Sequence, residues 1–470
     1  MIFIVIEKEI QMEEENQKKV KVPLVSRDTA AGADFSRTIL AKSVVQSAKD
    51  ETDYEKEESF IQHYERKVLT SFEQYRTVGI LSLVALPLGL FIGLVEVVFA
   101  NGLSFVTTTR LSNPVVLTAF LPLAGVFIAL LYYEFGKGAE RGMALVFEAA
   151  EGRAKVPLRL APLVMISSWI THLCGGSAGR EGVAVQIGAT IGDQLGRFFK
   201  KSSKLFSESR DTFIVCGIAA GFAGLFQTPL SAIFFSLEVL VCGELKYKSL
   251  FPSVVSAFSA QLVAKSFGIT GYKTWVHAVK FSPELLWKLL LMGLIFGVVG
   301  AFFSVTLKHT KQLLAKTFKN PAIRALFFGV ILAVAFIFLH SGRYSGFGEE
   351  ITHAALSSGT VYSYDWILKL VLTVLTLSAG FQGGELTPLF AIGSSLGATI
   401  AVLFKLPPQF VAALGYSAVF GSATNTFLAP IIIGFECFGA ENLPATVVVC
   451  AVAFFANFGR SIYGSQKKIF

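Results

Sequence analysis

The chain has 470 residues, of which 53% are hydrophobic and only 16% are charged, and its formal net charge is +8. Soluble proteins carry charge on about a quarter of their residues, so this composition, with a mean hydropathy of +0.61, excludes an ordinary soluble domain. The five cysteines lie scattered in apolar stretches without the spacing of metal ligands, and they predict neither a metal site nor a disulfide framework. The excess of basic residues is better explained by membrane orientation than by nucleic-acid binding, and we expect no cofactor.

The N-terminal part of the chain differs in composition from everything that follows. Residues 1–53 are rich in Glu and Lys and hold no long apolar run, which predicts a disordered cytoplasmic arm. Residues 54–76 could form an amphipathic helix on the membrane surface that leads into the first span. A dispensable tail is favoured over a functional binding partner for this arm.

Long apolar runs recur from about residue 79 to the C-terminus. Four of them are long enough, or nearly so, to cross about 30 Å of hydrocarbon: Ile80–Phe99, Val115–Tyr133, Leu285–Val305 and Ala325–Leu339. The sequence therefore predicts an all-α polytopic membrane protein whose partner is the lipid bilayer.

The membrane region contains an internal repeat. The segment Gly89–Gly93 recurs about 200 residues later as Gly293–Gly297, and Pro229 has a counterpart in Pro430. We expect residues 77–265 to form the first repeat and residues 284–464 the second.

Basic residues in the loops indicate that the second repeat is inverted. Residues 197–210 carry five Lys or Arg, whereas their counterpart, residues 399–411, has one; residues 308–324 again carry five, and their counterpart, residues 101–115, has one. Under the positive-inside rule, equivalent loops then lie on opposite faces of the membrane. In inverted-repeat transporters, broken helices from both halves meet at a substrate site near the midplane.

The most informative motif is Gly179-Arg180-Glu181-Gly182. An intramembrane carboxylate is costly unless it faces a cavity or a partner, and glycines that free backbone N–H groups are tolerated there only along a pathway. Such N–H groups attract anions at a helix start. The motif therefore predicts a site that links an anion to a proton; a buried ion pair with Arg180 is the alternative, although adjacent residues rarely face each other on a helix.

A matching break in the second half spans Gly383–Pro388. Glu385 could transfer protons beside an anion site, or could be a carboxylate stabilised by the helix dipole. Thr387 could donate its hydroxyl to the anion or proton path, or could cap the helix.

These breaks, together with the segment Gly142–Val146, resemble those of the CLC family of anion channels and anion/proton antiporters. The resemblance implies the CLC-type inverted-repeat fold, with gating and proton transfer by Glu181 and Glu385. It places the anion pathway along a set of residues from both halves: Met143, Gly179, Arg180, Gly182, Val183, Gly384, Leu386, Thr387 and Tyr463.

Departures from the chloride-selective pattern are similar to the fluoride/proton antiporter branch of that family. Met143 stands where chloride-selective members have a chloride-coordinating Ser, Val183 replaces the usual Pro, and Val239 replaces a second Glu. The resemblance therefore implies export of fluoride from the cytoplasm, driven by inward proton flow. A chloride/proton antiporter or chloride channel of the same fold is the alternative.

Several residues keep a second interpretation. Met143 could be plain packing, and Tyr463 could be an interfacial aromatic side chain. Arg180 could satisfy local carbonyls or pair with Glu148 or Glu151.

The resemblance further implies a homodimer, and a bacterial inner (plasma) membrane is the simplest location for a multi-pass protein without a visible targeting signal. We expect a transporter and not an enzyme. A remote alternative is an intramembrane serine hydrolase, because Gly175–Gly179 fits G-x-S-x-G around Ser177, with His172 nearby. No strand is predicted before Ser177, as that chemistry requires.

Overall fold

The computed structural model describes residues 75–199, 206, 209–357 and 359–469. The predicted arm, residues 1–53, lies outside the described residues, as does the predicted surface helix except for its last two residues. Those two already belong to the first long helix, Tyr75–Ser112.

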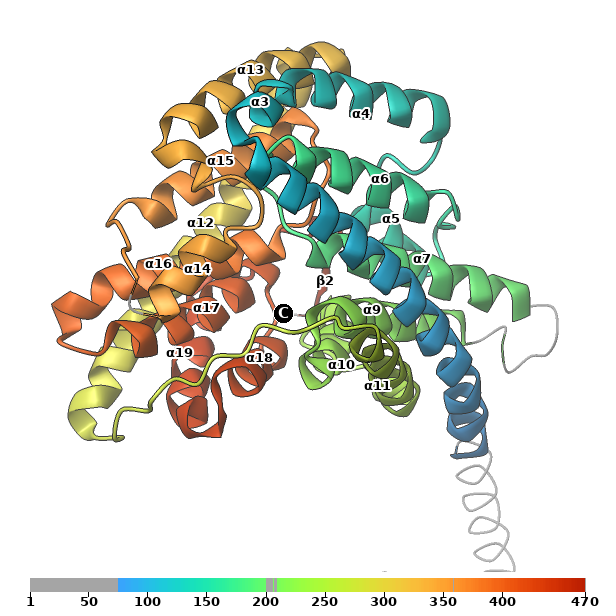
Figure 1. The fold of residues 1–470 in the computed structure, drawn as a ribbon. Coiled ribbons are helices and arrows are strands. Elements are labelled where there is room, and N and C mark those ends of the chain that lie inside the picture. The colour runs from blue at the N-terminus through green and yellow to red at the C-terminus, as the bar shows by residue number, and fades with distance from the viewer. Residues whose placement is uncertain (1–74, 200–205, 207–208, 358, 470) are drawn as a thin grey trace, which may run out of the picture. The chain divides into compact units, whose positions relative to one another are not determined.

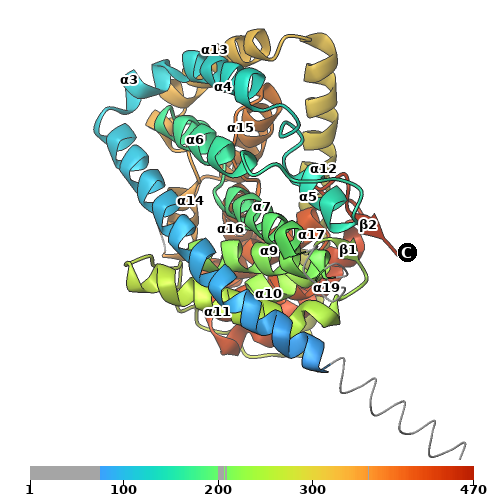
Figure 2. The ribbon, with the colours of Figure 1, turned by 90° about the vertical axis from the view of Figure 1, so that its right-hand side faces the viewer.

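The described part of the chain is built almost entirely of helices (Figures 1 and 2). After the helix Tyr75–Ser112, the first half continues with α3 (Pro114–Ala119), α4 (Leu121–Phe135), α5 (Met143–Ala150), α6 (Leu160–Leu173), α7 (Glu181–Phe199), α9 (Arg210–Phe226), α10 (Pro229–Glu238) and α11 (Leu250–Ser266). The second half consists of α12 (Pro283–Thr317), α13 (Pro321–Phe338), α14 (Glu349–Leu356), α15 (Asp365–Ala379), α16 (Leu386–Phe404), α17 (Pro408–Thr424), α18 (Leu428–Phe438) and α19 (Leu443–Ala456).

The order and lengths of the helices recur in the two halves. Helices α7 and α16 have 19 residues each, α9 and α17 have 17 each, and α5 and α14 have 8 each. Each half begins with one long helix, of 38 residues in the first half and 35 in the second. This correspondence agrees with the predicted internal repeat, whose boundaries at residues 77–265 and 284–464 stay a prediction.

Paired glycines set the close crossing of two helices in each half. A Cβ atom added at Gly188 of α7 would clash with the carbonyl of Gly217 on α9, and one added at Gly393 of α16 would clash with the carbonyl of Gly415 on α17. Small residues allow helix backbones to approach in membrane proteins, where apolar side chains gain little from facing each other instead of lipid. The same crossing therefore occurs in both halves for the same reason.

Within the described part of the chain, four helices are long and apolar enough to cross a membrane: Tyr75–Ser112, α12, α13 and α16. They contain three of the four predicted spans, but the predicted span Val115–Tyr133 is wrong as a single helix. The chain breaks at Phe120, between α3 and α4, where Pro122 is the second residue of α4. Proline lacks an amide N–H and fits only the first turn of a helix.

Apolar side chains cover much of the outer surface of α13. Only 28% of its most apolar window is buried, and Phe327 and Val334 are each 51% exposed. A soluble protein rarely exposes so large an apolar face, so these side chains suit contact with lipid.

Helices α10 and α18 cap each other with carboxylates. Glu238, the last residue of α10, accepts hydrogen bonds from the amides of Phe427, Leu428 and Ala429 at the start of α18, at 2.8–3.2 Å. Glu436, near the end of α18, accepts from the amides of residues 230 and 231 at the start of α10, at 3.1 and 2.8 Å. Each carboxylate thus satisfies free N–H groups at the positive end of the opposite helix.

A short C-terminal strand fastens the end of the chain to the first half. Strand β2 (Lys467–Lys468) pairs in parallel with β1 (Val241–Cys242), which follows α10. Three short 3-10 turns complete the described elements: Tyr247–Ser249, His340–Gly342 and Ala440–Asn442. The five cysteines are all buried and free.

Candidate ion-transport site

The two glycine-rich breaks meet through their backbones. The amide of Gly179 donates to the carbonyl of Gly384 at 2.6 Å, and the amide of Gly384 donates back to Gly179 at 2.7 Å. A Cβ atom at Gly179 would lie 2.7 Å from Thr387 Oγ1 and 2.8 Å from Pro388 Cδ. The close approach therefore requires glycine, and it places the starts of α7 and α16 side by side.

Glu181, the first residue of α7, is fully buried at this junction. The hydroxyl of Thr387 donates to its Oε2 atom, while Oε1 lies 3.5 Å from Arg180 Nε. Oε1 has no hydrogen-bond partner among the described residues. The carboxylate is thus held through one oxygen by a hydroxyl donor from the opposite half of the chain, while its other oxygen faces Arg180 without a hydrogen bond.

Arg180 contacts Glu181 although the two are adjacent, because Arg180 lies just before the helix and its side chain can turn back. Its second contact is Glu349, at 3.1 Å, and its guanidinium lies 5.0 Å from the ring centroid of Phe347. The suggested pairing of Arg180 with Glu148 or Glu151 is wrong, since both of these carboxylates pair with other basic side chains. The contact with Glu349 braces Arg180 from the second half of the chain.

A cavity of about 430 Å³ lies beside the junction. Its walls include the start of α5, the second turn of α7, the residue before α16 and the C-terminal segment, through Met143, Gln186, Glu385 and Tyr463. Lys311 also lines it and belongs to the basic segment 308–324, which the positive-inside rule assigns to the cytoplasmic side. The positive-inside rule therefore predicts that the cavity opens toward the cytoplasm.

Glu385 faces this cavity. Its side chain is 15% exposed, and its Oε1 atom lies 3.4 Å from Lys311 Nζ. A Cβ atom at Gly182 would lie 3.5 Å from its Oε2 atom, so the carboxylate sits next to the residue that follows Glu181. Its side chain makes no capping hydrogen bond to α16, which leaves it available to water in the cavity.

Met143 and Tyr463 both line the cavity. Met143 is the first residue of α5, and the ring of Tyr463 packs against Phe147 with 5.2 Å between centroids. Tyr463 is only 7% exposed, so its interpretation as an interfacial aromatic is wrong.

Two predicted pathway residues do not turn their side chains to the cavity. Val183 and Leu386 are fully buried in the apolar core. They lie in the first turns of α7 and α16, so only their backbone groups are near the junction. Gly182 and Gly384 lie at the junction itself, where a Cβ atom at Gly182 would be 3.0 Å from Gly384 Cα.

The geometry around Ser177 contradicts the serine hydrolase alternative. Ser177 is fully buried, and its hydroxyl lies 2.8 Å from that of Thr373. The ring nitrogens of His172 face the backbone carbonyls of Ser168 and Ala178, at 2.7 and 3.1 Å, instead of Ser177. Helix α6, not a strand, precedes the Gly175–Gly179 segment.

Three polar residues at or near the site were not predicted from the sequence: Gln186, Lys311 and Lys369. Gln186 lines the cavity, and its Oε1 atom would be 3.2 Å from a Cβ atom at Gly142. Lys369 is fully buried and donates to Ser177 Oγ at 2.9 Å. A signal existed for Gln186 and Lys369, because both are polar residues inside apolar runs and buried polar side chains in membrane segments mark functional sites. For Lys311, on an exposed basic segment, no such signal exists.

Matched helices in two halves, joined helix breaks, a buried carboxylate and an adjoining cavity define a polytopic membrane transport protein of the inverted-repeat class. Residues 124–457 match the family described as voltage gated chloride channel. The chain belongs to this family, and the predicted family and fold class are confirmed.

Individual relatives cover most of the chain. A chloride/fluoride channel protein of Pseudomonas syringae pv. tomato is 35% identical over 387 residues, which are 80% of this chain and 84% of the relative. The solved structure of a CLC-type fluoride/proton antiporter is 46% identical, with a TM-score of 0.80, and the match covers 83% of this chain and 98% of the other. A slow cyanobacterial Cl−/H+ antiporter, at 19% identity and a TM-score of 0.70 over 82% of this chain and 96% of the other, shares the fold.

Proposed function

We propose that the protein exchanges fluoride for protons across the membrane and exports fluoride from the cytoplasm with inward proton flow. The observation that carries this proposal is the buried carboxylate of Glu181, which a hydroxyl from the opposite repeat holds at the meeting point of two helix starts. The 46% identity to a solved fluoride/proton antiporter supports fluoride as the anion. The relatives are transport proteins, and we propose a transporter with no enzymatic activity.

Glu181 couples the two fluxes by occupying the anion's place. Deprotonated, its carboxylate sits at the start of α7, where the helix dipole and free N–H groups favour a negative charge. Protonated, it loses this attraction, leaves the place to fluoride and carries a proton with it. Because one location cannot hold both anions, movement of fluoride in one direction requires movement of protons in the other.

Glu385 is the proposed proton carrier between this junction and the cytoplasm. It reaches the cavity and lies beside Gly182, so it can receive a proton from Glu181 and pass it to water. Lys311 at 3.4 Å stabilises the carboxylate after the proton has left.

The anion follows the remaining residues at the junction and along the cavity. Met143 and Tyr463 line the cytoplasmic mouth, Arg180 lies at the opposite end of the gate, and Thr387 holds Glu181. Gly179, Gly182 and Gly384 keep the helix starts close together, and Leu386 contributes a backbone N–H group. The amide of Val183 donates to the carbonyl of Arg180 at 3.1 Å, so Val183 holds the first turn of α7 instead of offering a free N–H group.

The experiment is anion efflux from liposomes that contain the purified protein, with fluoride compared to chloride and with pH recorded. Fluoride preference with opposite proton movement is expected for the wild type. Glu181→Gln is expected to abolish proton coupling, and Glu385→Gln to impair proton transfer. Glu140→Gln is the matched control, because Glu140 lines the same cavity but is exposed at its rim.

A different result would contradict each part of the proposal. Proton-driven transport at the wild-type rate by Glu181→Gln would remove the gate. An unchanged proton-to-anion ratio in Glu385→Gln would remove the proton carrier. Chloride flux equal to or above fluoride flux would leave the gate in place but make the protein a chloride/proton antiporter. Relatives at 24–27% identity are named H(+)/Cl(−) exchange transporters.

We also propose a homodimer in a bacterial inner membrane, with one pathway per subunit. Crosslinking in native membranes, followed by the mass of the crosslinked species, tests the dimer.

A further inference from the structure

Lys369 is a buried basic residue that the transport cycle described above does not use. It lies in the second turn of α15 and is fully buried. Its ammonium donates to Ser177 Oγ at 2.9 Å and to the carbonyls of Tyr344 and Gly346 at 3.0 and 2.8 Å. Three oxygens thus match the three donors of the ammonium, and all three are neutral.

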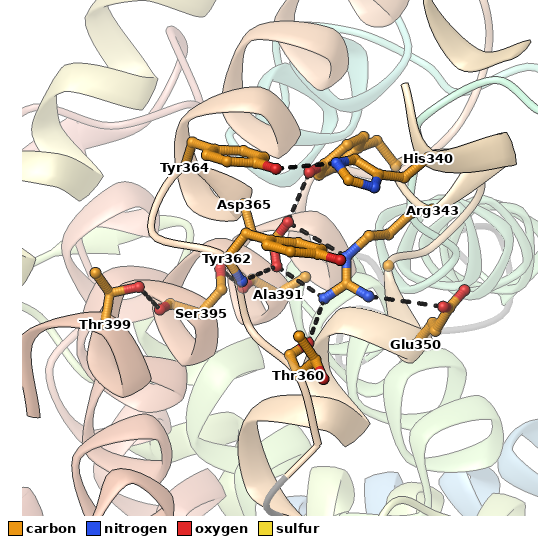
Figure 3. A network of polar contacts seen from close by, with 12 residues as sticks. His340, Arg343, Glu350, Thr360, Tyr362, Tyr364, Asp365, Ala391, Ser395 and Thr399 are labelled. Atoms are coloured by element: carbon orange, nitrogen blue, oxygen red, sulfur yellow. Dashed lines mark hydrogen bonds and ion pairs between the residues drawn. The ribbon is translucent and has the colours of Figure 1, made fainter. Parts of the chain in front are cut away.

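The nearest acid on the same helix is already neutralised. Asp365, one turn earlier, accepts from Arg343 Nη2 at 2.8 Å and from the hydroxyl of Tyr344 at 2.6 Å. Figure 3 shows Asp365 between Arg343 and Tyr362, whose amide also donates to it, at 2.9 Å. No salt bridge joins Lys369 to a carboxylate within residues 75–199, 209–357 and 359–469.

An unpaired ion in a membrane interior is costly, and such residues usually face a partner that function supplies. For Lys369, the missing partner is an anion. The proposed transport cycle offers two species of this kind, the carboxylate of Glu181 and the transported ion, and Ser177, which accepts from Lys369, lies four residues before Glu181.

The orientation of α15 places Lys369 on the side of the gate away from the cytoplasmic cavity. Arg324, in the basic segment assigned to the cytoplasm, donates to the carbonyl of Ala379 at the end of α15, at 3.1 Å. The start of α15, with Asp365 and Lys369, is therefore toward the opposite face. Along the direction of α15, Lys369 and the cavity therefore lie on opposite sides of the Gly179–Gly384 junction.

Lys369 also contacts both segments that hold Arg180. Ser177 lies three residues before Arg180, and a Cβ atom at Gly348, the neighbour of Glu349, would lie 2.8 Å from Lys369 Cε. Glu349 in turn binds Arg180 at 3.1 Å. A displacement of Lys369 would thus move the segments that carry Arg180 and Glu349, the two partners of this ion pair.

We propose that Lys369 is a positioning residue for the gate, whose ammonium group favours an anion at the outer end of the transport pathway. The inference rests on the proposed function, because it assumes that Glu181 gives up and regains a proton during transport. The chemical class of the species that Lys369 attracts is a small monovalent anion or the carboxylate that takes its place.

The charged and titratable groups around Lys369 come from several elements. They are Arg110 of the first helix, His172 of α6, Arg180 and Glu181 at the start of α7, Arg343 and Tyr344 of the segment before α14, Glu349 of α14 and Asp365 of α15. Arg180 pairs with Glu349, and Arg343 with Asp365. Arg110, which donates to Ser345, and Lys369 then remain as cations without a carboxylate partner among these groups.

The test is the pH dependence of anion-coupled proton uptake in liposomes, measured with whichever anion the wild type transports. Lys369→Gln keeps amide donors for the neutral oxygens but removes the charge. Loss of a nearby positive charge disfavours the carboxylate, so Glu181 holds its proton to higher pH. The midpoint is expected to rise by roughly half a unit to one unit, and exchange at neutral pH to fall.

Three further variants separate the effect of the Lys369 charge from the effect of its hydrogen bonds. Lys369→Arg retains the charge and is expected to keep the wild-type midpoint. Ser177→Ala removes one hydrogen bond without touching the charge and is expected to do the same. Asp365→Asn removes a negative charge one turn away while keeping an oxygen acceptor, and it is expected to move the midpoint in the opposite direction, to lower pH.

Specific results would overturn the proposal. Folded Lys369→Gln with the wild-type midpoint and rate would show that the charge is inert. If Lys369→Gln does not fold, Asp365→Asn decides the question, and an unmoved midpoint would reject the electrostatic role. A wild type that prefers chloride, or that moves an anion without protons, contradicts the proposed function and is visible before any variant is made.

Discussion

Thr387, at the start of α16, donates its hydroxyl hydrogen to the carboxylate of Glu181, at the start of α7. The two residues lie about 200 positions apart, in corresponding helices of the two repeats. The amide of Arg180 donates to the same hydroxyl oxygen at 3.3 Å, which orients the hydroxyl hydrogen toward Glu181. Each repeat therefore supplies half of the proposed gate, one the ionisable group and the other its donor.

Thr387→Val is expected to make Glu181 easier to protonate. Valine keeps the shape of threonine but offers no donor, and a hydrogen bond to a charged group contributes about 1.5–3 kcal/mol. Loss of the donor disfavours the carboxylate, so the pH midpoint of proton-coupled transport should rise by roughly one to two units. Flux assays over a pH series check this, with Thr387→Ser as the control that keeps the hydroxyl. An unmoved midpoint in the valine variant would show that the hydrogen bond does not hold the gate.

Gly179→Ala is expected to disrupt the contact between the two repeats. The added methyl group would lie 2.7 Å from Thr387 Oγ1 and 2.8 Å from Pro388 Cδ, and overpacking of this kind costs about 1–3 kcal/mol. We expect a lower Tm in detergent and a loss of transport. Gly79→Ala is the matched control, because no atom lies within 4 Å of a Cβ there. Equal melting temperatures for the two variants would contradict the argument.

The sequence predicts those parts of the site that depend on local signals. Glu181 and Glu385 stand out because each is a carboxylate beside glycines in an apolar region, and such a pattern needs no knowledge of distant contacts. The ion-pair partner of Arg180 could not be predicted in this way. The partner of Arg180 is Glu349, on a helix whose approach is set by the topology of both halves, so nearby Glu148 and Glu151 were the natural but wrong candidates.

Two further departures have identifiable causes. The apolar run Val115–Tyr133 divides into α3 and α4 because Pro122 acts on the backbone, which hydropathy does not register. Lys369 follows the same rule that singles out Glu181, yet a single lysine inside a run of leucine and valine does not reveal its partners. Ser177, Tyr344 and Gly346 come from segments that only the fold brings together.

Glu436→Gln is expected to weaken the packing of α10 on α18. Glutamine keeps one acceptor oxygen but loses the charge that complements the free N–H groups at the start of α10, a contribution of about 0.5–2 kcal/mol. Glu238→Gln should act in the same way at the start of α18. Thermal melting in detergent measures both, with exposed Glu441→Gln as the control. If only the control lowered the Tm, the caps would be energetically irrelevant.

Gln466→Leu is expected to loosen the segment that carries Tyr463 to the cavity. The amide group of Gln466 donates to the carbonyls of Val239 and Thr424, at 3.0 and 3.1 Å, and accepts from Asn425 at 3.3 Å. These partners are buried, and each one left unsatisfied costs about 1–3 kcal/mol. The variant should therefore melt at a lower temperature.

Transport by Gln466→Leu should also fall, because Gln466 lies three residues after Tyr463 and its backbone amide donates to the Tyr463 carbonyl at 3.0 Å. The variant keeps this bond but frees the segment from its side-chain contacts to Val239 and Thr424. Tyr463→Phe separates position from chemistry, since it keeps the ring against Phe147 and removes only the hydroxyl. If position matters, the Gln466 variant loses transport even where Tyr463→Phe retains it. Exposed Lys468→Gln, in the strand β2 that follows Gln466, should change neither stability nor rate. A Gln466 variant with a lower Tm but wild-type transport would limit this residue to holding the end of the chain.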